Sequence, residues 1–82
     1  MEKDIEMYLE KYRFIKGLEE VIIAAKIGDI VKIDYHLDDK YIETISIEYR
    51  GGWIQKIPTS GNSNIANLMV IAEAICGREN VL

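Results

Sequence analysis

The sequence predicts one α+β domain, in which a helix, three antiparallel strands and a second helix follow one another (αβββα), with the helices packed on one sheet face. Apolar residues recur every three or four positions in residues 1–27, alternate with polar ones in 29–57, and return to helical spacing in 63–77. The chain has 82 residues, 49% of them hydrophobic and 29% charged, which fits a single globular domain spanning 1–82.

The first helix is predicted from residues 2–16, where acidic and basic residues separate apolar positions that lie three or four apart. Gly17 leaves open whether this helix continues, bends or is split in two, because an interior glycine costs about 1 kcal/mol relative to alanine. The pattern resumes at Leu18 and is expected to stop at Gly28, a residue type common just after helix ends. The apolar positions of the first part are Ile5, Tyr8, Leu9, Tyr12 and Ile15.

Three strands are predicted from the alternation that starts at Ile30, and together they form an antiparallel meander with one apolar face. Parity predicts loops with an odd number of residues, 38–40 and 50–52, because an even second loop would place the charged Lys56 on the apolar face. The predicted pairs are Tyr49 with Trp53, Ile45 with Ile57, Leu37 with Tyr41 and Ile33 with Ile45. Val31 is expected on the apolar face; the other face carries Lys32, Asp34, His36, Thr44, Ser46 and Glu48.

The last helix is predicted to start near Ser63 and to end at Gly77. It is apolar on nearly all sides, which is typical of a helix buried on more than one side. Either the first helix covers the second side, or a partner chain does; the low charge of the segment favours a homodimer or larger homo-oligomer through this helix. A glutamate at Ile71 is then expected to release monomers.

Composition argues against several functional classes. The net charge of −4 is unfavourable for non-specific nucleic-acid binding, which depends on an excess of Lys and Arg. A single cysteine, Cys76, excludes a disulfide framework, and no apolar run reaches the roughly 18 residues of a membrane span. With one imidazole and no nucleophile motif, neither an enzyme nor a cofactor is expected. We therefore expect a cytoplasmic protein, in the host cytoplasm if the chain is viral, with no membrane partner.

A metal site is the weakest alternative. Period-two spacing places Asp34, His36 and Asp38 on one strand face, and carboxylate and imidazole groups suit a divalent cation. The ordinary interpretation is a solvated strand face that runs into an acidic turn. Because no second histidine and no other ligand cluster is visible, no metal ligand is assigned, and an enzyme or metal protein centred on these residues remains a third hypothesis.

A better site candidate is the third strand with the polar loop and the helix start that follow it. Free backbone N–H groups at a helix start suit an anion, and hydroxyl and amide side chains can read a ribose or a base. Capping needs only one such residue, with Ser60, Asn62 or Ser63 as candidates, whereas five cluster here. The candidate ligand-binding residues are Trp53, Lys56, Thr59, Ser60, Asn62, Ser63, Asn64, Asn67 and Arg78.

The order of elements resembles the double-stranded RNA-binding domain over most of the chain. That family contacts phosphates through lysines at the start of its second helix, where this sequence has Asn62, Ser63 and Asn64. The resemblance therefore implies a topology and gives no reason to expect RNA binding.

In size, acidity and layout, the chain is similar to small phage-encoded anti-defence proteins. One type is a sponge, an oligomer that sequesters nucleotide immune signals in pockets between a small sheet and a helix; the other is the anti-CRISPR type, which blocks an effector. Acidic and basic residues are interleaved here, which disfavours DNA mimicry and favours the sponge. The resemblance implies a non-enzymatic oligomeric binder of a small nucleotide-like signalling ligand. The alternative is a protein–protein inhibitor or adaptor that binds a host defence protein through its acidic or polar surface.

Overall fold

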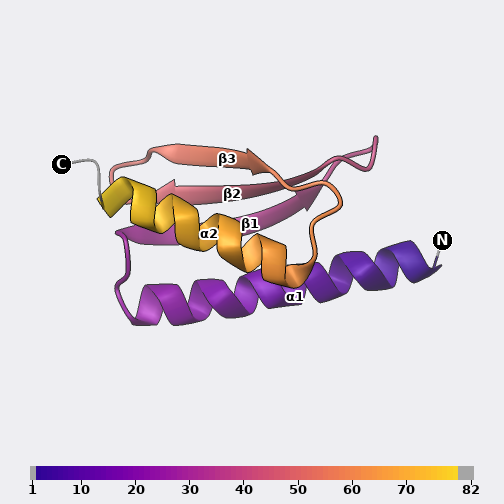
Figure 1. Ribbon diagram of the computed structural model, residues 1–82, viewed down its shortest axis with the longest axis horizontal. Coiled ribbons are helices and arrows are strands. Elements are labelled where there is room, and N and C mark those ends of the chain that lie inside the picture. The colour runs from indigo at the N-terminus through magenta and orange to yellow at the C-terminus, as the bar shows by residue number, and fades with distance from the viewer. Residues whose placement is uncertain (1, 80–82) are drawn as a thin grey trace.

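The computed structural model describes residues 2–79 of the chain and the side chains of residues 5–77 (Figure 1). It confirms the predicted αβββα order, with both helices packed against one sheet. Figure 1 shows α1 running along β1, whereas α2 lies across a face of the sheet. The elements are α1 (Glu2–Ala24), β1 (Ile30–Leu37), β2 (Glu43–Tyr49), β3 (Ile54–Pro58) and α2 (Asn64–Glu79).

The helix α1 ends through a Schellman motif rather than at Gly28. Lys26 takes up a left-handed conformation (φ 56°), and its N–H donates to the Ile23 carbonyl at 3.1 Å. The N–H of Ile27 reaches back to the Ile22 carbonyl, also at 3.1 Å, which completes the motif. The expected glycine stop was wrong because the chain leaves the helix before it reaches that residue. At the other end of the chain the difference is in the opposite direction: α2 continues past its expected stop at Gly77 and ends at Glu79.

The sequence left open whether Gly17 splits the first helix, and α1 is continuous across it. A Cβ atom at this position would meet nothing within 4 Å. We therefore expect Gly17→Ala to stabilise the domain by about 0.5–1 kcal/mol, and thermal unfolding should show a melting temperature raised by roughly 4 °C. Gly28→Ala is the control, because its φ is +66° and its Cβ would lie 3.3 Å from Ile75; this variant should melt lower. A lower melting point for Gly17→Ala would contradict the expectation.

The second hairpin has the predicted register. Ile45 pairs with Ile57 across β2 and β3, and the Tyr49 N–H donates to the Trp53 carbonyl at 2.8 Å. The loop therefore spans residues 50–52, as the parity argument requires.

The first hairpin is paired two residues away from the predicted register, with Leu37 opposite Glu43 and Ile45 opposite Tyr35. The loop has five residues, 38–42, instead of three. The carboxylate of Asp38 accepts the N–H groups of Lys40 and Ile42 at 2.8 and 2.9 Å, and this side-chain bonding holds the longer turn. Both loop lengths are odd, so Ile33, Tyr35 and Ile45 still face the core. Tyr41, which was predicted on the apolar face, instead lies in the loop and is exposed.

A bulge near the start of β1 changes the predicted facing of its first residues. The register shifts between Ile30 and Lys32. As a result Ile30 is buried and Val31, expected on the apolar face, is exposed.

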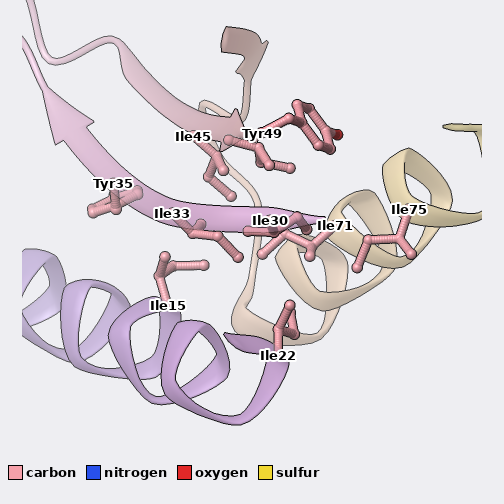
Figure 2. Packing of buried hydrophobic residues seen from close by; sticks show 10 residues of the cluster. Ile15, Ile22, Ile30, Ile33, Tyr35, Ile45, Tyr49, Ile71 and Ile75 are labelled. Carbon is pink, nitrogen blue, oxygen red and sulfur yellow. The ribbon is translucent and has the colours of Figure 1, made fainter. Parts of the chain in front are cut away.

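The core lies between the sheet and the two helices and consists largely of isoleucines (Figure 2). α1 contributes Ile15 and Ile22, and α2 contributes Ile71 and Ile75. Ile71 is only 1% exposed, so its side chain faces the sheet and lies outside any interface between chains. The expectation that a glutamate at Ile71 releases monomers was therefore wrong. The buried apolar residues are Ile15, Ile22, Ile30, Ile33, Tyr35, Ile45, Ile47, Tyr49, Ile71 and Ile75.

Side chains of α1 cover the outer edge of β1. Glu19 accepts the backbone N–H of Ile33 at 2.6 Å, and Lys16 donates to the carbonyl of the same residue at 2.9 Å. Lys16 also pairs with Asp34 at 2.6 Å, and this hydrogen bond is the main cause that lowers the pKa of the Asp34 carboxyl. The backbone groups of Ile33, which an edge strand normally exposes, are thus bonded to side chains of α1.

Candidate ligand-binding site

A pocket of about 320 Å³ lies between the first half of α1, the end of β1 and the start of β2. Its wall is aromatic: the rings of Tyr8 and Tyr35 lie 5.4 Å apart at an angle of 33°, and Tyr41 at the pocket is 70% exposed. Tyr8 and Lys11 both reach the pocket because residues three apart on a helix share a face. The lining residues are Met7, Tyr8, Lys11, Tyr35, Leu37, Tyr41 and Glu43.

The carboxylate of Glu43 organises the polar end of this pocket. It accepts hydrogen bonds from the Tyr35 hydroxyl and, at 3.0 Å, from the Gly61 N–H, and it forms an ion pair with Lys11 at 2.7 Å. Burial alone would raise the pKa of Glu43, but these three donors outweigh it and hold the pKa below its ordinary value. Burial, reinforced by the bond to Glu43, raises the pKa of Tyr35 well above its usual range, so the hydroxyl remains a donor.

The predicted loop supports the pocket rather than lining it. The hydroxyl of Ser60 accepts the Glu43 N–H at 3.0 Å, and the Thr59 N–H donates to the Glu43 carbonyl at 2.9 Å. With the Gly61 contact, three consecutive loop residues fix the position of Glu43, and Glu43 in turn fixes Tyr35 and Lys11.

The start of α2 uses one of the candidate residues as its cap. Ser63 is the N-cap, because its hydroxyl accepts the N–H of Ala66, three residues on, at 3.2 Å. The backbone N–H of Asn62 closes a turn onto the Thr59 carbonyl at 3.0 Å. Capping therefore explains Ser63, and the turn places Asn62.

The remaining candidates do not gather at this loop. Trp53 precedes β3 and stacks on Tyr49 with ring centroids 4.9 Å apart, whereas Thr59 follows the other end of the strand. Lys56 is exposed, and it pairs with Ser46 on the polar face of the sheet. The side chain of Arg78 lies outside the described residues. The structure thus separates Trp53 and Lys56 from the loop.

Four polar side-chain atoms between the end of β3 and the first turns of α2 are buried without a hydrogen-bond partner among the described residues. They are the hydroxyl of Thr59, the carbonyl oxygen of the Asn64 amide and both polar atoms of Asn67. Asn64 and Asn67 lie three residues apart and so share one side of the helix.

Two of the three candidate metal ligands have other partners. Asp34 pairs with Lys16 and Lys32, Asp38 bonds its own turn, and His36 is exposed. Within residues 5–77, no three His, Cys, Asp or Glu side chains form a group that could hold a metal ion.

The sequence contained a signal for the pocket in Glu43. By parity this position belongs to the apolar face of β2, together with Ile45 and Ile47. A carboxylate at an inward position needs partners, and this one has Lys11 and Tyr35, supplied by two other segments of the chain.

Comparison of the chain with family models, with curated proteins and with solved structures gave no match. Neither helix, over its described residues, combines the length and the apolar composition that crossing a membrane requires.

Proposed function

We propose that the protein is a non-enzymatic binding domain that sequesters a small nucleotide-like ligand in the pocket beneath the first half of α1. The observation that carries the proposal is the set of three tyrosines, Tyr8, Tyr35 and Tyr41, around a space of about 320 Å³. Aromatic side chains stack on nucleobases with little dependence on sequence, and a cavity of this size suits a small ligand.

The charges at the pocket favour a ligand with few phosphates. Lys11 is the cation of the lining, and Glu43 neutralises it through their ion pair. The lining therefore offers no excess positive charge for a polyphosphate, while the lysine retains donors for a single anionic or carbonyl group. A nucleoside or a cyclic nucleotide fits this arrangement better than a triphosphate.

Isothermal titration against nucleosides, cyclic nucleotides and triphosphates tests the proposal. We expect binding by the first two groups, and we expect Tyr41→Ala to weaken it roughly five- to hundredfold, the range of one stacked ring. Tyr41→Phe is the control, since it keeps the ring and should retain affinity. If no compound titrates or raises the melting temperature, the ligand-binding proposal is wrong.

We further propose that the binder is a homo-oligomer, with the outer side of α2 as the interface. This side is apolar and solvent-exposed in the single chain, with Ile65 72% and Met69 58% exposed. Such a stripe at helical spacing matches a second copy of itself, with the exposed Glu73 at its margin. This surface supports the oligomeric part of the proposal, a sponge similar in size and layout to phage-encoded anti-defence proteins. The stripe consists of Ile65, Leu68, Met69, Ala72 and Cys76.

The alternative is a protein–protein inhibitor or adaptor, and a second exposed surface favours it. Ile5 and Leu9, one turn apart on the first half of α1, are both exposed, next to the acidic residues of the same helix. Large exposed apolar side chains are typical of surfaces that bind another protein. Nucleotide titration separates the two functions, because an inhibitor that acts through this surface needs no nucleotide.

A further inference from the structure

The interior next to the start of α2 contains polar groups that the proposed pocket does not use. Asn67 is fully buried, and neither its amide nitrogen nor its amide oxygen has a partner among the described residues. Thr59 is 1% exposed, and its hydroxyl also has no hydrogen-bond partner among the described residues. The buried oxygen of Asn64 lies one helical turn before Asn67.

Groups of this kind are costly unless something satisfies them. A buried donor or acceptor without a partner loses its hydration and gains nothing in return. Natural domains satisfy almost all such groups, frequently with an internal water molecule that makes two to four hydrogen bonds. Four such atoms on three side chains, two of which are fully buried, within nine residues therefore indicate a built site for a polar guest.

The chemistry of the three side chains defines the guest. Asn67 and Thr59 can each donate and accept, while the Asn64 oxygen only accepts. No described ion pair or hydrogen bond brings a charged side chain to these atoms, which disfavours an ionic guest. We infer that Thr59, Asn64 and Asn67 form an internal site that binds water, held between the loop and the inner side of α2.

Asn67→Leu tests the site through the sign of its effect, because leucine has a similar size and no polar atoms. If a water molecule bridges Asn67 to Thr59, the variant leaves that water and the Thr59 hydroxyl without the hydrogen bonds that Asn67 provides. The melting temperature should then fall by roughly 4–8 °C. If Asn67 is simply unpaired among apolar side chains, leucine should raise the melting temperature, and that result would overturn the inference.

Thr59→Val, alone and combined with Asn67→Leu, tests whether Thr59 and Asn67 bind the same water molecule. Thr59→Val removes the hydroxyl and keeps the shape and the backbone bond to Glu43. With a shared water, the second substitution should cost much less than it does alone, so the double variant melts close to the lower of the two single variants. Melting-point shifts that simply add would contradict a shared site.

Where Asn67→Leu fails to fold, the wild-type protein decides. Nuclear magnetic resonance should show a nuclear Overhauser cross-peak between the side-chain NH₂ of Asn67 and a long-lived water molecule. This cross-peak must not arise from hydrogen exchange with the solvent. The side-chain NH₂ of Gln55, which is only half-buried, serves as the reference for water that exchanges rapidly. Absence of the Asn67 cross-peak in the folded protein would overturn the inference.

Discussion

Ile71→Glu is expected to abolish folding of the domain. The side chain is 1% exposed and packs with Ile75 against the isoleucines of the sheet (Figure 2). Burying an unpaired carboxylate there costs several kcal/mol, and a domain of this size has only about 5 kcal/mol or little more to lose. Circular dichroism should show no cooperative thermal transition at pH 7. A folded variant with a melting point near that of the wild type would show that the helix is not seated as described.

Met69→Glu is the matched variant for the outer side of α2. Met69 is 58% exposed, so a glutamate there should leave the fold intact. If a second copy covers this side, light scattering should show an oligomer for the wild type and a monomer for Met69→Glu. A monomeric wild type at high micromolar concentration would contradict the proposed interface.

Glu43→Gln is expected to produce the second large loss of stability. The side chain of Glu43 is 13% exposed and receives Lys11, Tyr35 and the Gly61 N–H. Glutamine keeps the shape but leaves the Lys11 ammonium buried without its counter-charge, which costs about 3 kcal/mol. Urea denaturation at pH 7 measures the loss. Glu48→Gln, on the polar face of β2, is the control and should change stability little; an equal loss in both variants would contradict the role of Glu43.

The same contacts predict how stability changes with pH. Because the pKa of Glu43 is lower in the folded protein than in the unfolded chain, its contribution is present above the ordinary carboxyl pKa and is lost as pH falls through the folded value. Asp34 acts in the same direction. The raised pKa of Tyr35 acts at the other end, and its contribution is lost as pH rises above about 10. Urea midpoints should therefore fall below about pH 4.5, and Glu43→Gln should flatten that acid limb.

The order of elements was predictable because it depends on the period of apolar residues, which is local. The second hairpin was predictable for the same reason, with Lys56 deciding between two registers. The first hairpin was not, because the Asp38 side chain stabilises a longer loop, and hydrogen bonds of this kind leave no mark on the apolar pattern. The Ile30–Lys32 bulge is likewise invisible to a count of alternating residues.

The pocket at Glu43 was not predicted from the sequence, because its residues lie far apart along the chain. The pocket takes Tyr8 from α1, Tyr35 from β1 and Glu43 from β2, and none of these stands out within its own segment. The loop at 59–61 did stand out, and it lies directly behind Glu43 as its support. A dense polar loop indicated the neighbourhood of the pocket but not its walls.

The covered edge of β1 also limits how this sheet can aggregate. Lys16 and Glu19 bond the backbone of Ile33, so a strand from another molecule cannot pair there without displacing α1. Within the described chain only the outer side of β3 is open to a further strand. Two molecules joined through β3 would have a β1 covered by α1 at both ends of the combined sheet. Strand addition would then stop at two chains, and growth into a fibre, which needs a free edge on every added molecule, has no second site from which to continue.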